Sequence, residues 1–221
     1  SISALNAYLR DPYRYYLAYV LRLRELNDRA EELDGADFGS LAHDVFSRFA
    51  RGPCAHSRRA PEINAFLQQT LWQLAEIRYG SDRSAPVQLQ LIQLSRRLES
   101  FAYQQAAETL NGWFICPEGT ELPIRASLPG MSDLVLTARF DRVDRHQSGR
   151  LRVLDYKTGD AGKTPEQVHR VRRRGEVRWQ NLQLPLYRLM AQAQFQQPVD
   201  VGFFNLPRRL GDVRVYQAEW S

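Results

Sequence analysis

The chain has 221 residues, 43% of them hydrophobic and 11% aromatic, which is enough to bury a sizeable core and excludes a disordered polypeptide. Its formal net charge of +5 suits a polyanionic partner without establishing one. Two cysteines, Cys54 and Cys116, are too few for a disulfide scaffold or a zinc cage, so we expect free thiols in the reducing cytoplasm. No apolar run approaches the length of a membrane span, and no membrane partner is expected.

The first 23 residues predict two helices. Ser3 can cap the first helix, and Asp11 followed by Pro12 is a favourable cap and first turn for the second. The second helix is rich in tyrosine at positions 13, 15, 16 and 19. Aromatic stripes usually serve a core, so we favour packing of this helix on the domain; the alternative is a surface that stacks on bases.

Residues 25–37 are acidic and predict a solvated loop, whereas residues 38–51 predict an amphipathic helix with apolar side chains at three- and four-residue spacing. His43 lies beside this apolar stripe. A histidine in such a place is more often a packed core residue than a metal ligand. Two long helices are expected next, over residues 61–79 and 86–110.

From Trp113 the apolar period changes from helical to alternating. Strands are predicted over residues 113–115, 121–128, 134–143 and 151–156, then a helix over 180–194 and two closing strands over 199–206 and 213–219. We therefore expect an α/β protein with one domain over residues 1–221, mainly helical over 1–111 and sheet over 112–221. The chain begins at Ser1 without a methionine, so we expect it to be excised from a longer protein.

The segment ARFDRVDRHQSGRLRVLDYKTG, residues 138–159, predicts a hairpin that brings Asp141, Asp155 and Lys157 together. Alternate residues of a strand share a face, so Asp155 and Lys157 stand side by side while Tyr156 points into the core. Asp144 competes with Asp141, but an odd step of three places it on the other strand face, so we favour Asp141. Two carboxylates and an ammonium on one face are the layout of a divalent-metal phosphodiesterase.

A basic stretch follows, from Lys163 to Arg178, and precedes the helix that carries Gln183 and Tyr187. Such a run is usually a solvated face, but its place beside the acidic cluster favours contacts with a DNA backbone. The predicted DNA-binding residues are Lys163, Arg170, Arg172, Arg173, Arg174 and Arg178. Gln183 and Tyr187 are four residues apart and share one helix face.

Four short motifs, in this order along the chain, resemble the RecB-like branch of the PD-(D/E)XK nucleases. They are the tyrosine-rich N-terminal segment, the Gly39–His43 turn, the pair ARFDRVD and LDYKTG, and the Gln183–Tyr187 helix. The resemblance implies a restriction-endonuclease-like core, a mixed β-sheet flanked by helices, with an N-terminal helical layer. It also implies Mg²⁺ or Mn²⁺ as cofactor, with metal ligands His43, Asp141, Asp155 and the carbonyl of Tyr156, and a catalytic set of Lys157, Asp155, Asp141, Gln183 and Tyr187.

The chain departs from the family pattern in two places. Some relatives carry a cysteine of an iron–sulfur cluster where Asp11 stands here, and this chain has no C-terminal cysteine, so no iron–sulfur cluster is expected. The family often uses a further glutamate ahead of the first aspartate. Glu121, Glu108 and Glu99 are candidates among which the sequence does not choose.

The resemblance implies a divalent-metal-dependent DNA nuclease, expected to be an exonuclease of recombination or repair that acts with a helicase domain or subunit. The alternative is a catalytically inactive DNA-binding or scaffolding module of a helicase–nuclease complex. An RNA substrate is a third, more distant possibility.

Overall fold

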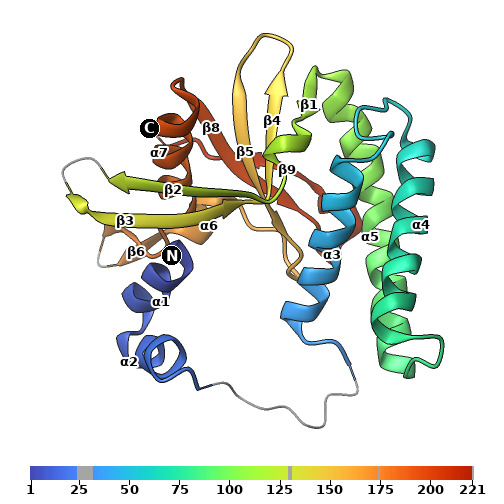
Figure 1. Ribbon diagram of the computed structural model, residues 1–221, viewed down its shortest axis with the longest axis horizontal. Helices are drawn as coiled ribbons and strands as arrows, with labels where there is room; N and C mark the ends of the chain where they lie inside the picture. The colour runs from blue at the N-terminus through green and yellow to red at the C-terminus, as the bar shows by residue number, and fades with distance from the viewer. Residues whose placement is uncertain (24–31, 129–130, 174, 221) are drawn as a thin grey trace.

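A five-stranded mixed sheet forms the centre of the computed structural model, which describes residues 1–23, 32–128, 131–173 and 175–220 (Figure 1). Its strand order is β1-β4-β5-β8-β9, in which β5 and β8 are parallel and the other neighbours are antiparallel. The strands span Trp113–Ile115 (β1), Arg142–His146 (β4), Leu151–Lys157 (β5), Val199–Asn205 (β8) and Arg214–Gln217 (β9). The predicted class, a mixed sheet flanked by helices, is confirmed.

Three helices cover one face of this sheet: α3 (Gly35–Ala50), α4 (Ala60–Tyr79) and α5 (Ala85–Leu110) (Figure 1). Helix α3 begins three residues before its predicted start because Asp34 Oδ1 caps it, accepting from the backbone N–H groups of Ala36 and Asp37. The loop predicted over residues 25–37 is therefore wrong for residues 35–37, which belong to α3. Residues 25–31 of that loop lie outside the described part of the chain.

The core beneath these helices is aromatic. Leu154 and Tyr156 of β5 and Phe204 of β8 point to this face at alternate strand positions. The Phe46 ring of α3 stacks on Tyr156 with 4.3 Å between ring centroids, and Phe101 of α5 lies 4.6 Å from Phe204. The prediction that Tyr156 points into the core is confirmed, and the packing fixes α3 against β5.

The opposite face holds α7 (Gln183–Phe195), α1 (Ile2–Arg10) and a long hairpin of β2 (Leu122–Leu128) and β3 (Met131–Phe140) (Figure 1). Helix α7 begins three residues later than predicted, and Pro185 lies in its first turn, where its missing N–H costs least. Val153 and Phe203 contribute to the apolar cluster on this face. The sheet thus separates two cores.

The strand predicted over 134–143 is in fact two strands. Strand β3 ends at Phe140 and pairs with β2, whereas β4 begins at Arg142 and pairs with β1 and β5. Asp141 lies at the passage between the two sheets rather than inside a strand. The apolar alternation through Leu136, Ala138 and Phe140 changes phase at Val143, and this shift is the sequence signal of the break.

The basic stretch, predicted without regular structure, contains α6 (Pro165–His169) and a hairpin of β6 (Arg170–Arg173) and β7 (Glu176–Trp179). Thr164 and Gln167 form a capping box at the start of α6. Two further short segments, Pro117–Gly119 and Leu210–Asp212, are 3₁₀-helical turns. Within the described ranges, none of the helices has the length and apolar character needed to cross a membrane.

The tyrosine-rich N-terminal segment comprises α2 (Pro12–Tyr15) and a π-helical turn over Tyr16–Val20. The favoured prediction that its tyrosines serve a core is wrong. Tyr13 is 70% exposed, Tyr16 48% and Tyr19 45%, and no residue of either helix is buried.

Candidate active site

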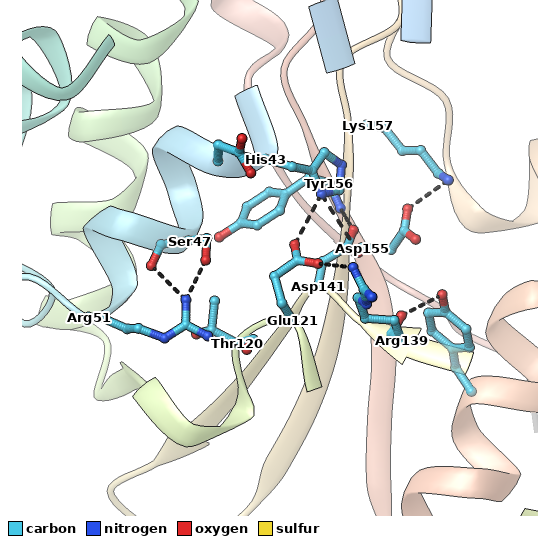
Figure 2. Close-up of polar contacts among 12 residues, drawn as sticks. His43, Ser47, Arg51, Thr120, Glu121, Arg139, Asp141, Asp155, Tyr156 and Lys157 are labelled. Atoms are coloured by element: carbon cyan, nitrogen blue, oxygen red, sulfur yellow. Dashed lines mark hydrogen bonds and ion pairs between the residues drawn. The ribbon is translucent and has the colours of Figure 1, made fainter. Parts of the chain in front are cut away.

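His43 reaches the site from α3, one turn after Gly39. Its Nδ1 atom lies 3.4 Å from Glu121 Oε1 and 3.8 Å from Asp141 Oδ1 (Figure 2). The edge of its ring packs against the face of Tyr156. Burial lowers the pKa of His43, but the hydrogen bond to Glu121 and the charge of Asp141 outweigh burial, and the pKa is raised.

Asp141 is anchored by the backbone of β5. Its Oδ2 atom accepts a hydrogen bond of 2.9 Å from the N–H of Tyr156, and its Oδ1 atom faces His43. Burial, then the negative charge of Asp155, raises the pKa of Asp141 to about 7. A carboxylate that resists ionisation in this way gains most from a nearby cation.

Glu121 is the glutamate that the structure places in the cluster. It stands just before β2 with φ of +52°, in the left-handed region that is costly for a residue other than glycine, and its N–H donates to the carbonyl of Asp141. Its other carboxylate oxygen lies 3.7 Å from the guanidinium of Arg139. Of the other candidates, Glu108 pairs with Arg152 at 2.8 Å and Glu99 is exposed on α5.

His43, Glu121 and Asp141 offer three ligand atoms that all lie within 4.8 Å of one another. Two carboxylates and an imidazole form a donor set that hard divalent cations such as Mg²⁺ and Mn²⁺ accept. Nearby, Oδ2 of Asp155 is buried and lies 2.6 Å from the Lys157 ammonium. The donor set of His43, Glu121 and Asp141 and the raised pKa of Asp141 fit a cation at this place.

Asp155 and Lys157 lie side by side on β5, as their spacing predicts. The Lys157 ammonium is 2.6 Å from Asp155 Oδ2 and forms an ion pair with it. It donates to Gln183 Oε1 at 3.2 Å and lies 5.0 Å from the ring centroid of Phe203. Lys157 is therefore held at three points while its side chain stays 37% exposed.

Gln183 and Tyr187 link α7 to both strands of the site. Gln183 Nε2 donates to Asp155 Oδ1 and to the Tyr187 hydroxyl, which donates in turn to the carbonyl of Arg139 at the end of β3. Burial raises the pKa of Tyr187, so its hydroxyl keeps its proton at neutral pH.

Asp144 belongs to a different, fully buried network. It accepts hydrogen bonds from the guanidinium groups of Arg142 and Arg152, and Arg142 also donates to Gln105 of α5. The two arginines lower the pKa of Asp144 even though burial alone would raise it. Asp144 is thus neutralised inside the fold, away from the cluster of His43.

The basic stretch divides into side chains with different surroundings. Lys163 lines a cavity next to Lys157, and Arg172 is exposed. Arg170 lies over the indole rings of Trp179 and Trp220, and Arg178 pairs with Glu176 at 3.0 Å. Arg173 ends β6, and Arg174 lies outside the described residues.

The family model of the PD-(D/E)XK nuclease superfamily matches residues 1–219. An ATP-dependent helicase/deoxyribonuclease subunit from Symbiobacterium thermophilum is 32% identical over 181 residues, which cover 72% of this chain and 15% of that protein. Subunits of the same name from Oceanobacillus iheyensis and Clostridium acetobutylicum are 28% and 27% identical over 191 and 178 residues, again 15% of each relative. The chain therefore spans about 15% of the length of these relatives. Because the family model matches nearly all of the chain, the chain belongs to the PD-(D/E)XK nuclease superfamily.

Proposed function

We propose that this chain is a divalent-metal-dependent deoxyribonuclease that hydrolyses phosphodiester bonds, and that it acts as an exonuclease in recombination or repair. The observation that carries the proposal is the convergence of His43, Glu121 and Asp141 within 4.8 Å beside the Asp155–Lys157 pair. These five side chains come from α3, β5 and the ends of the β2–β3 hairpin. These residues are distant along the chain, and buried carboxylates repel one another. Their convergence at one place therefore favours a site that binds a cation.

His43, Glu121 and Asp141 would hold the cation, with Asp155 and the carbonyl of Tyr156 as further ligands. A bound Mg²⁺ or Mn²⁺ would supply Lewis-acid stabilisation of charge on the phosphate oxygens. The Tyr156 N–H fixes Asp141, and the hydroxyl of Tyr187 fixes the end of β3 from which Asp141 follows. The site is thus positioned by backbone bonds before any ligand arrives.

Lys157 is the residue we assign to the reacting phosphate. Its ammonium lies 2.6 Å from Asp155 Oδ2, so both groups can approach the same phosphate of a bound substrate. Its side chain is 37% exposed and therefore accessible to that substrate. There it would offset negative charge that develops on the phosphate in the transition state. Gln183 holds Lys157 and Asp155 together from α7, so we assign it a positioning role.

DNA is the proposed partner, held by the basic stretch. In the described part of this stretch, Lys163, Arg170 and Arg172 pair with no acid. Of these, Arg170 lies over indole rings, whereas Arg178 pairs with Glu176. Contacts of this kind reach phosphates and carry no sequence preference. We further propose that the chain is one nuclease domain of a longer cytoplasmic protein that contains or binds a helicase, because the relatives it matches are named helicase/deoxyribonuclease subunits.

Cleavage of labelled single- and double-stranded DNA, with Mg²⁺, with Mn²⁺ and with a chelator, tests the proposal. Lys157→Ala should lower the rate by roughly 100-fold or more, the usual cost of removing one charge-stabilising group. Arg58→Ala, at an exposed arginine in the connection between α3 and α4, is the matched control and should leave the rate unchanged. Equal activity of wild type and Lys157→Ala would overturn the assignment.

The second candidate function is a catalytically inactive scaffold of the same fold. Titration calorimetry with Mn²⁺ separates the two. The nuclease proposal expects binding to the wild type that Asp141→Ala abolishes, whereas an absence of binding to both proteins would favour the scaffold.

A further inference from the structure

Two cavities share part of their lining, and one of them reaches Lys157. The first, here called the lysine cavity, has a volume of about 340 Å³ and follows the end of β5, between Lys157 and Lys163. The second, the α1 cavity, has about 320 Å³ and lies between α1, α6 and the turn before α7, with Asn6, Arg10, Lys163, Gln167 and Asn181 among its lining. Lys163 and Val168 line both. The two cavities, together called the path below, therefore lie on either side of Lys163 and Val168 and extend from Lys157 to the N-terminal helix.

The charge along this path is positive. The chain has only two lysines, Lys157 and Lys163, against 28 arginines, and both line the lysine cavity. Asp160, the one acid of that cavity's lining, lies 3.6 Å from Arg97. The lining of the α1 cavity contains Arg10 and Lys163 and no carboxylate, and neither cation pairs with an acid in the described ranges. An anion is the ligand that such a lining favours.

The amide side chains of the α1 cavity are arranged as donors. Asn6 Oδ1 accepts from the N–H of Leu182, Asn181 Oδ1 accepts from the N–H of Gln183, and Gln167 Oε1 accepts from Thr164. The carbonyl end of each amide is thus used by the backbone, and the NH₂ ends have no partner among the residues that the structure describes. Free NH₂ groups and two cations match the oxygens of a phosphodiester, which only accept hydrogen bonds.

Exposed aromatic rings continue the path beyond Arg10. Tyr13, Tyr16 and Tyr19 are exposed on the segment that follows α1, and the rings of Tyr15 and Tyr19 stack with their centroids 5.2 Å apart. Unpaired bases stack on such rings, whereas the bases of a duplex are already stacked on each other. The segment therefore favours a single strand over a duplex.

We propose that the α1 cavity binds the phosphate backbone of single-stranded DNA next to the scissile nucleotide, and that the strand continues over the exposed tyrosines. This proposal rests on the proposed nuclease function, which it deepens by naming the substrate form and its path. Asn6, Arg10 and Asn181 join Lys163 as contacts to the strand. The contacts reach phosphates and ring faces, so the path accepts any base sequence.

Fluorescence anisotropy with a labelled oligothymidylate of about 20 nucleotides, in a chelator so that no cleavage occurs, tests the path. Asn6→Asp keeps the acceptor for the Leu182 N–H and places a carboxylate in the cavity, so we expect binding to weaken about tenfold. Arg10→Gln should weaken binding and reduce the slope of log K against log salt by about 0.7, the value for one phosphate contact on a single strand. Tyr16→Ser should weaken it about fivefold to tenfold through lost stacking.

Matched controls lie on the other side of the molecule. Asn64→Asp on α4 matches Asn6→Asp, because it also keeps an oxygen that accepts a hydrogen bond, there from Gln68 Nε2. Arg58→Gln and Tyr103→Ser match Arg10→Gln and Tyr16→Ser, because they replace an exposed arginine and an exposed tyrosine. All three should bind the oligonucleotide within about twofold of wild type. Unfolding midpoints report whether Asn6→Asp folds, and Arg10→Gln decides the result if it does not.

The outcomes separate this proposal from the nuclease function. Weaker binding by Asn6→Asp and Arg10→Gln supports the path even if the wild type cleaves no DNA. Wild-type affinity and salt slope in Arg10→Gln overturn the path even if the wild type is an active nuclease. Equal affinity for a duplex of the same length, with equal losses in the variants, also overturns it.

Discussion

Asp141 is buried beside the carboxylate of Asp155, and both effects make the stability of the fold depend on pH. A carboxyl group whose pKa rises from 3.8 to about 7 on folding keeps a proton that the unfolded chain has lost. Between about pH 4 and pH 7 the folded state therefore holds more protons than the unfolded state, and the free energy of unfolding falls as the pH rises.

Asp141→Asn should remove this penalty. The amide carbonyl can still accept from Tyr156 N–H, so we expect the variant to be more stable than wild type at pH 8 in a chelator, by at least about 1 kcal/mol, with little difference at pH 4. Urea unfolding at the two pH values measures this. Equal stabilities at pH 8 would show that the carboxylate of the wild type is not penalised.

Asp144 has the opposite role, because it neutralises two arginines with no exposure to solvent. Asp144→Ala would leave Arg142 and Arg152 buried with one fewer counter-charge, and we expect a loss of about 3–5 kcal/mol. Chemical unfolding monitored by far-ultraviolet circular dichroism gives the value. Glu99→Ala, at an exposed acid on α5, is the control and should change stability by less than about 0.5 kcal/mol.

At the scale of elements, the helices of the first half were predictable because local signals mark them. Prolines open α4 and α5, and Gly80 ends α4. The early start of α3 depends on Asp34, a cap that stands inside an acidic run and is therefore hard to distinguish from it. The β6–β7 hairpin was missed because its four-residue strands are mostly charged and the alternation of Val177 and Trp179 is too short to stand out; all four residues of β7 are exposed.

Without the family resemblance, which implied His43, the site was predictable only where its residues are close in sequence. The spacing of Asp155 and Lys157 on one strand predicts their contact, and it is observed. Glu121 could not be chosen over Glu108 because the choice depends on pairing between distant segments and on a left-handed backbone at Glu121. A glutamate directly ahead of a strand that leads toward the aspartate is the signal that would have favoured it.

Two glycines make a matched test of the elements around the site. A Cβ on Gly202 of β8 would lie 2.3 Å from the carbonyl oxygen of Tyr216 on β9, whereas one on Gly39 of α3 meets only Thr158 Oγ1 at 3.6 Å. Gly202→Ala should therefore cost at least about 2 kcal/mol by forcing the two strands apart. Gly39→Ala should be neutral or gain up to about 1 kcal/mol of helix stability. Thermal unfolding of both variants measures the contrast, and a stable Gly202→Ala would contradict the β8–β9 register.

At the scale of the whole molecule, the candidate metal ligands come from different layers. His43 belongs to the helical layer, Glu121 to the hairpin and Asp141 to the passage into the central sheet. A cation bound by all three would connect these layers and would bind the folded chain alone. Mn²⁺ at 100 times its dissociation constant should then raise the free energy of unfolding by about 2.7 kcal/mol.

Thermal unfolding with increasing Mn²⁺ measures this linkage. The midpoint should rise with the logarithm of the Mn²⁺ concentration in wild type and stay constant in His43→Ala. His56→Ala, which removes a histidine bonded to the carbonyl of Ile115, is the matched control and should keep the response to Mn²⁺. A rise of equal size in His43→Ala would place Mn²⁺ elsewhere on the protein.

The bond from the Tyr156 N–H to Asp141 also orients that carboxylate. One oxygen accepts the backbone N–H and keeps a second lone pair, whereas the other oxygen faces His43 and is the one aimed at the cluster. Ca²⁺ fills its six to eight positions with help from carboxylates that bind through both oxygens, whereas Mg²⁺ needs six and takes single oxygens from each group. We therefore predict that a cation bound through this single oxygen of Asp141 is of the size of Mg²⁺ rather than Ca²⁺.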